Sequence, residues 1–292
     1  MFPPPKASSW KATGSRMNRR AAGFTLVEMI VAMVIMGIIA AVIGMILKPP
    51  IDSYVASKNR AYLASTAEGA ISLITRDIRS ALPNSVRMPA KGATHCIEML
   101  PTNGGGRYRA DRLIDGTKGN PIDFATETSQ FDVLAGDIAK ASAGDLVAIY
   151  NLGIPDADAY RQDNTAAIAA LSGTSLIKLS APKKFPVDSP AQRFFTLPAN
   201  SSVYLCLNAG TASGKGAGTL FQYPNALAAT FDECPTAAPA NAVVVASQVS
   251  ACAFSYAPGV NARTGIVTMT LGLTNSDETI QLYREAHVSN AP

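Results

Sequence analysis

One carboxylate in this chain lies where an ionisable group is costly. Glu28 is inside an apolar run from Phe24 to Leu47, in which Thr25 is the other polar residue. A charge inside a membrane-spanning segment costs several kcal/mol near the centre and less near an end, so it needs a partner. A cationic amine would lower that cost. The alternative is that Glu28, about one turn inside the run, reaches the headgroups by snorkelling.

The apolar run is long enough to cross a membrane. As an α-helix that rises about 1.5 Å per residue, residues 24–47 would extend about 36 Å, whereas the hydrocarbon core of a bilayer is about 30 Å thick. Lys48 ends the run, and Pro49 and Pro50 predict an interruption of the helix there. The positive-inside rule predicts that the preceding basic residues stay in the cytoplasm and that the following chain is exported.

Those basic residues account for the net charge of the chain. The formal net charge is +4, and five of the 25 Lys and Arg lie within residues 1–23, which contain no acidic residue. The remainder holds 20 basic and 21 acidic residues, a net charge of −1. The positive balance therefore indicates a targeting leader. Beyond it the basic residues are scattered and lack interleaved aromatic residues, so we expect no nucleic-acid partner.

The leader meets the apolar run at the hexapeptide GFTLVE, residues 23–28. A conventional secretory signal is cut after its apolar region, next to small residues, and residues 55–57 offer only a distant and poor site. The junction resembles that of type IV prepilin-like proteins. This resemblance implies that prepilin peptidase cuts after Gly23 and methylates the new N-terminal amine of Phe24. The alternative is an ordinary signal anchor in which Gly23 and Glu28 occur by chance.

The same resemblance implies what Glu28 does. In a filament it would pair with the amine of Phe24, on the same subunit or an adjacent one, while residues 24–47 pack against other major and minor pilins. The chain would first occupy the inner membrane as a single-pass protein with a periplasmic C-terminal domain. After engaging the pilus assembly platform it would join a pilus or pseudopilus.

Further segments resemble the minor pseudopilins that serve biogenesis of mannose-sensitive haemagglutinin (MSHA) pili. This resemblance implies a low-copy structural subunit, not an enzyme, that helps to initiate or cap a filament. A minor pseudopilin of type II secretion is the related alternative. Compared with the family, the leader is long and the two prolines are unexpected. The similar segments are IRSALPNSVR (78–87), CIEMLP (96–101), GDLVAIYNLG (144–153), CAFSY (252–256) and EAHVSNAP (285–292).

Beyond the run, the pattern predicts an α+β, pilin-like fold. A helical stripe of Ala67, Ile71, Ile74, Ile78 and Leu82 should pack on the globular domain and end at Pro83. We therefore divide the chain into a cleaved leader (1–23), a transmembrane and assembly helix (24–47), an amphipathic helix (48–83) and a periplasmic β-rich domain (84–292).

Short β-branched runs predict that this last domain is an antiparallel sheet with long loops. Gly, Ala, Asn and Pro mark residues 103–121, 155–173 and 208–242 as the loops. The last two strands should form a hairpin around residues 275–278. The predicted strands are residues 96–100, 145–150, 175–179, 202–207, 243–249, 252–256, 266–273 and 279–285.

Four cysteines, Cys96, Cys206, Cys234 and Cys252, contain no CxxC pair, which argues against zinc and a redox dithiol. In an exported domain they predict two disulfides, of which three pairings are possible. We favour Cys206 with Cys234, because the glycine-rich stretch between them has little else to hold it, and hence Cys96 with Cys252. Buried free thiols are the alternative.

Residues that could support catalysis are few. His95 and His287 belong to no nucleophile or metal motif, and the glycines at 104–106 lack the flanks of a phosphate loop and favour a mobile turn. Two acidic pairs, Asp156 with Asp158 and Asp277 with Glu278, lack the spacing of a calcium loop. We therefore predict no metal and no cofactor. The competing class is a membrane-tethered periplasmic enzyme or ligand-binding domain with an uncleaved leader.

Overall fold

The structure, a computed structural model, describes residues 23–111, 119–259, 264–288 and 290. The chain divides into two compact units between Val55 and Ala56. Helix α1 (Leu26–Arg79) begins in the first unit and ends in the second, and the described strands all lie in the second. The strand pairs of the sheets and the barrel are antiparallel. The predicted fold class, a long N-terminal helix with a largely antiparallel β domain, is confirmed.

The C-terminal part of α1 has one buried face. Its buried residues recur every three or four positions, the spacing that brings side chains to one face of a helix. They include four of the five predicted stripe residues. The helix ends at Arg79, before the expected Pro83, so Leu82 is buried from the segment that follows. The buried helical residues are Leu63, Ala67, Ala70, Ile71, Ile74 and Ile78.

The expected interruption at Pro49 and Pro50 is wrong, because α1 continues through both prolines. Each proline lacks the N–H group that donates to the fourth preceding carbonyl, which weakens the helix locally. However, the proline ring fixes φ near about −65°, a value that is itself helical. The two residues therefore remove hydrogen bonds without ending the helix.

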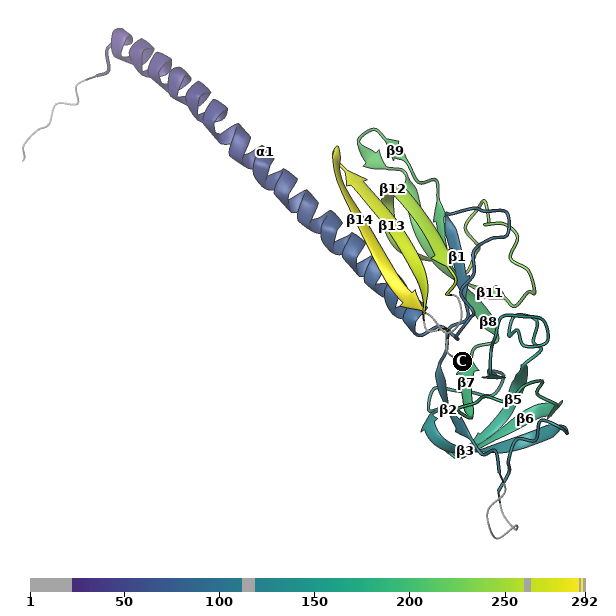
Figure 1. The fold of residues 1–292 in the computed structure, drawn as a ribbon. Helices are drawn as coiled ribbons and strands as arrows, with labels where there is room; N and C mark the ends of the chain where they lie inside the picture. The colour runs from purple at the N-terminus through teal and green to yellow at the C-terminus, as the bar shows by residue number, and fades with distance from the viewer. Residues whose placement is uncertain (1–22, 112–118, 260–263, 289, 291–292) are drawn as a thin grey trace, which may run out of the picture. The chain divides into compact units, whose positions relative to one another are not determined.

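Six strands form the sheet that covers the buried face of α1 (Figure 1). Ile71, Ile74 and Ile78 share one core with sheet residues such as Ile97 and Met269. Two ion pairs join the same helix to the last strand, Arg60 with Glu278 at 2.7 Å and Arg284 with Glu68 at 2.5 Å. In sheet order the strands are β1 (Cys96–Met99), β8 (Asn200–Leu207), β11 (Gly218–Ala226), β12 (Val243–Ala257), β13 (Gly265–Asn275) and β14 (Glu278–Val288).

Most of the predicted strands belong to this sheet. The hairpin is confirmed, since β13 and β14 pair up to Asn275 opposite Glu278. Two predicted strands, residues 243–249 and 252–256, are one strand, β12, which shifts register between Val249 and Ala251. A β-bulge of this kind explains why the alternating pattern of the sequence appears broken there.

Six further strands, which lie between β1 and β8 in the sequence, form a closed barrel. Because β1 and β8 are paired neighbours in the sheet, the barrel is an insertion into the sheet domain. Its core includes Phe131 and Phe194, whose rings pack edge to face with their centroids 5.3 Å apart. Around the barrel the strands are β2 (Gly104–Tyr108), β3 (Thr128–Asp137), β6 (Leu176–Lys183), β5 (Thr165–Ser172), β4 (Leu146–Ile149) and β7 (Arg193–Leu197).

The three predicted loops are wrong in part, because each contains strands. Residues 103–121 include β2, residues 155–173 include β5, and residues 208–242 include β9 (Thr211–Ala212), β10 (Lys215–Gly216) and β11. Residues 112–118 of the first predicted loop lie outside the described residues.

The glycines at 104–106 are also not a turn but the start of β2. A Cβ atom on Gly106 would lie 2.3 Å from the carbonyl oxygen of Ala135, so the adjacent strands of the barrel approach too closely for a side chain. Opposite Gly106 on β3, Gly136 has a φ of +144°, a backbone conformation that residues other than glycine rarely adopt.

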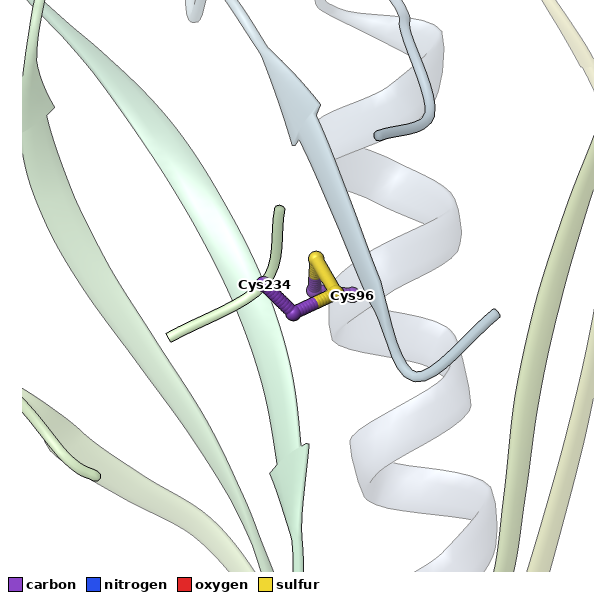
Figure 2. Close-up of a disulfide and its surroundings, with 2 residues drawn as sticks. All are labelled: Cys96 and Cys234. Atoms are coloured by element: carbon purple, nitrogen blue, oxygen red, sulfur yellow. A yellow bond between two sulfur atoms is a disulfide. The ribbon is translucent and has the colours of Figure 1, made fainter. Parts of the chain in front are cut away.

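The four cysteines form two disulfides, as predicted, but the favoured pairing is wrong. Cys96 on β1 is bonded to Cys234 in the segment after β11 (Figure 2). Cys206 on β8 is bonded to Cys252 on β12. The argument for a Cys206–Cys234 bond assumed an unstructured stretch between them, whereas β11 lies there and is held by both of its neighbours in the sheet.

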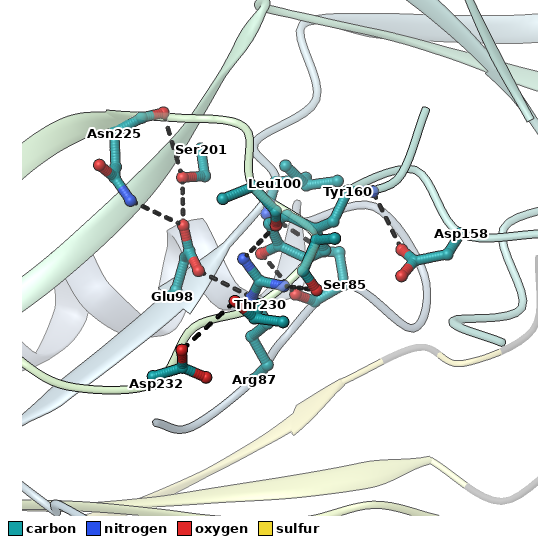
Figure 3. Close-up of polar contacts among 12 residues, drawn as sticks. Ser85, Arg87, Glu98, Leu100, Asp158, Tyr160, Ser201, Asn225, Thr230 and Asp232 are labelled. Carbon is teal, nitrogen blue, oxygen red and sulfur yellow. Dashed lines mark hydrogen bonds and ion pairs between the residues drawn. The ribbon is translucent and has the colours of Figure 1, made fainter. Parts of the chain in front are cut away.

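A buried polar network joins the sheet to the barrel (Figure 3). Arg87 donates to Glu98 of β1 over 2.7 Å and to the carbonyl oxygens of Ala228 and Ala229. Its guanidinium carbon also lies 3.5 Å from the ring centroid of Tyr160, which belongs to the inserted segment. The Tyr160 hydroxyl donates to the carbonyl oxygen of Ser85 over 2.8 Å. These contacts fasten the insertion to the segment that follows α1.

Candidate processing and assembly site

The predicted cleavage junction lies at the start of α1. Gly23 and Phe24 are exposed and precede the helix, and the Phe24 side chain is 79% exposed. Residues 1–22 of the predicted leader lie outside the described residues. Both groups on which the predicted processing depends, the peptide after Gly23 and the amine of Phe24, are therefore on the non-helical chain just ahead of the first turn.

Thr25 caps this helix, a role that the sequence reasoning missed. The backbone N–H of Glu28 donates to the Thr25 hydroxyl oxygen over 3.3 Å, and the Thr25 N–H donates to the Glu28 carboxylate over 3.5 Å. The Thr25 carbonyl accepts from the Met29 N–H, as the residue before a helix does. This reciprocal arrangement is a capping box, and its signature, Thr followed three residues later by Glu, is legible in the sequence.

The capping box gives Glu28 a second possible role beside the predicted amine pairing. Its bond to the Thr25 N–H is at the long limit for a hydrogen bond, so it holds the carboxylate weakly. Glu28 is exposed, and its other carboxylate oxygen, Oε1, makes no hydrogen bond with a residue that the structure describes. The geometry therefore leaves a charge-bearing oxygen available to a neighbouring amine.

The surface that follows is apolar and uncovered. Leucine, valine, isoleucine and methionine side chains from Leu26 to Leu47 are about half exposed or more. By length and composition, α1 is able to cross a membrane. An exposed apolar surface of this size indicates that lipid or another protein covers it.

A comparison with protein-family models decides the class of this segment. Residues 18–44 match the model of the prokaryotic N-terminal methylation motif. The chain carries a prepilin-type methylation motif. This motif supports a type IV prepilin-like protein, and together with one apolar N-terminal helix it fits a single-pass membrane-anchored pilin. Comparisons with curated proteins and with solved structures give no match.

The prepilin motif also bears on partners and on chemistry. It implies processing by prepilin peptidase and a context of pilin assembly, and it points to a structural subunit and not to an enzyme. Among the described residues, no group of three or more His, Cys, Asp or Glu could hold a metal ion.

One member of each acidic pair considered for calcium is engaged within the chain. Asp158 accepts from the Tyr160 N–H over 2.9 Å, and burial raises the pKa of its carboxyl. Glu278 is paired with Arg60, which lowers the pKa of the Glu278 carboxyl. The backbone N–H of Asp156 donates to Asp163. One carboxylate of each pair, that of Asp158 and that of Glu278, is therefore bonded to another residue of the chain.

Proposed function

We propose that this chain is a minor pilin or pseudopilin, a structural subunit that helps to initiate or cap an MSHA-like type IV pilus. The observation that carries the proposal is the prepilin-type motif joined to an exposed apolar helix and then to an antiparallel sheet. The resemblance of five further segments to the MSHA pilus biogenesis pseudopilin MshO supports the finer assignment.

The N-terminal segment determines the proposed order of processing, membrane anchoring and assembly. Residues 1–23 are the removed leader, prepilin peptidase cuts after Gly23, and the amine of Phe24 is methylated. Residues 24–47 first anchor the protein in the inner membrane and later pack among other pilins, where Glu28 pairs with the Phe24 amine. Residues 48–83 continue into the periplasmic domain of residues 84–292.

The inserted barrel bears on the position in the filament. It adds a second β-rich body, residues 104–197, to the sheet that packs on α1. Extra bulk on each subunit hinders repeated close packing of globular domains around a shared helical core. This favours a few copies at a filament end over a subunit that forms the bulk of the filament.

The decisive experiment is intact-mass and N-terminal analysis of the full-length protein extracted from membranes of cells with and without prepilin peptidase. We expect a methylated Phe24 N-terminus only where the peptidase is present. An intact Met1 in cells that contain the peptidase would contradict the proposal and favour an uncleaved, membrane-tethered periplasmic domain. Recovery of the processed protein with secretion pseudopili, and not with pili, would instead favour the type II secretion alternative.

A further inference from the structure

A hollow of about 790 Å³ lies at one end of the inserted barrel. It is lined where β2 ends, at Tyr108, where β3 begins, at Thr128, and by residues 188–192 before β7. The barrel joins the sheet domain through the opposite ends of β2 and β7, at Gly104 and Leu197. Ligand sites in proteins have volumes of about 300–1,000 Å³, so the hollow has the size of such a site.

Three buried residues that line this hollow carry hydroxyl groups with no acceptor among the described residues. Tyr108 is 1% exposed, Thr128 is 6% exposed and Ser189 is 2% exposed. The Tyr108 hydroxyl accepts from the Ser189 N–H over 3.0 Å, and the Ser189 hydroxyl accepts from the Arg193 N–H over 3.1 Å. Neither donates to a described residue, and the Thr128 hydroxyl makes no hydrogen bond with one. Among the described residues, the hydrogens of these three hydroxyl groups therefore have no acceptor, and a ligand in the hollow is a possible source of one.

Carboxylate side chains line the same hollow. Asp123, Glu127 and Asp188 line the hollow and are exposed. Asp123 accepts from the Ala125 N–H and from a threonine hydroxyl, which lowers the pKa of its carboxyl, whereas Glu127 and Asp188 accept no hydrogen bond from a described residue. No Lys, Arg or His lines the hollow within the described part of the chain. An ionised carboxylate is an acceptor only, so the ligand must supply donors.

Together these groups restrict the class of ligand. Carboxylates disfavour an anion. A lysine or arginine side chain carries donors only, so it would leave the three hydroxyl hydrogens without acceptors. Each hydroxyl of a neutral polyol, by contrast, both donates and accepts. The partly buried ring of Phe124, 5.9 Å from that of Tyr108, adds an apolar face for the carbon-bound hydrogens of a sugar ring. We propose that this hollow binds a neutral saccharide.

The proposal is tested with the full-length protein in a detergent that has no sugar headgroup. The probe is an array of immobilised neutral, sialylated and sulfated glycans, and hexalysine is tested separately. We expect binding to at least one neutral glycan and none to sulfated glycans or hexalysine. Binding confined to charged glycans or to hexalysine, or the absence of any neutral hit, overturns the proposal. The readout does not depend on leader cleavage, so it is independent of the proposed pilin function.

Two variants place the binding in the hollow. Thr128→Val keeps the shape of the side chain and removes one hydroxyl, so the affinity for the neutral hit should fall about two- to twelvefold. Asp188→Asn, at an exposed position, should also weaken binding without affecting folding. The matched control is Thr268→Val on β13, which removes a hydroxyl outside the hollow and should leave the affinity unchanged. Unchanged affinity in both hollow variants would also overturn the proposal.

Discussion

Arg87 and Glu98 form an ion pair over 2.7 Å in which the Glu98 side chain is fully buried and that of Arg87 is 19% exposed. Their backbones also exchange hydrogen bonds in both directions, Arg87 N–H to Glu98 oxygen and the reverse. Ser201 and Asn225 donate to the second carboxylate oxygen of Glu98. A buried carboxylate with this many partners is stable only while all of them are present, since a lone buried charge is costly.

Removing the cation should therefore be more damaging than removing the pair. Arg87→Met should lower the free energy of unfolding by about 3–5 kcal/mol, because it leaves Glu98 buried without a counter-charge. Denaturant unfolding of the purified protein, followed by circular dichroism, measures the change.

The control for this prediction is the double variant Arg87→Met/Glu98→Gln, which should recover part of the loss. Arg284→Met, which breaks an ion pair whose side chains are 45% and 51% exposed, should cost less than about 1 kcal/mol. Equal losses at Arg87 and Arg284 would contradict the importance given to burial.

The disulfide pattern predicts two different losses of stability. The Cys96–Cys234 bond closes 138 residues and the Cys206–Cys252 bond closes 46. In the chain-entropy model these loops correspond to about 5 and about 4 kcal/mol. Replacing both cysteines of either pair with serine should lower the free energy of unfolding without creating a free thiol. Peptide mapping without reduction tests the pairing directly, and a Cys206–Cys234 peptide would refute it.

Tyr223 should make stability fall in strong alkali. Burial, and then the charge of Glu98, raises the pKa of its phenol to about 12, whereas the ordinary value is 10.0. Between these two pH values the unfolded chain has released the proton and the folded protein retains it, so the free energy of unfolding decreases as pH rises. Tyr223 alone should contribute about 1.4 kcal/mol per pH unit to this slope, and the phenols of Tyr160 and Tyr204, whose pKa values burial also raises, add to it.

Tyr223→Phe removes this contribution and should reduce the alkaline slope by about 1.4 kcal/mol per pH unit, while the decrease due to Tyr160 and Tyr204 remains. The Tyr223 hydroxyl makes no hydrogen bond with a described residue, so the substitution should change little near neutral pH. The measurement is denaturant unfolding at intervals from pH 9 to pH 12. An identical pH dependence in the two proteins would show that Tyr223 is not responsible.

The parts of the fold that the sequence predicted are those with local patterns. The helical stripe at Ala67, Ile71, Ile74 and Ile78 and the hairpin at residues 275–278 depend on neighbours a few positions away. The role of the glycines at 104–106 depends instead on Ala135 and Gly136, which the closed barrel brings against them. Because glycine is otherwise typical of turns, the local pattern favoured a turn.

The cysteine pairing and the insertion failed for the same reason. Which cysteines meet depends on the order of strands in the sheet, and the pairing of β1 with β8 across the barrel is invisible to a local pattern. At the candidate site, the junction at Gly23 was legible because its signal is contiguous. The capping role of Thr25 is equally local, because its signature is Thr25 followed three residues later by Glu28.

The substitution Glu28→Gln separates the two roles of Glu28. Glutamine at this position can still complete a capping box with Thr25, but it carries no charge for an amine. Glu28→Gln should therefore preserve the start of α1 and leader cleavage, yet reduce incorporation into filaments if amine pairing drives assembly. Thr25→Ala is the matched variant, since it removes the cap at a cost of about 1 kcal/mol and keeps the charge. Immunoblotting of sheared filaments beside membrane fractions measures both steps. Normal incorporation of Glu28→Gln together with poor incorporation of Thr25→Ala would assign the requirement to the cap and not to the charge.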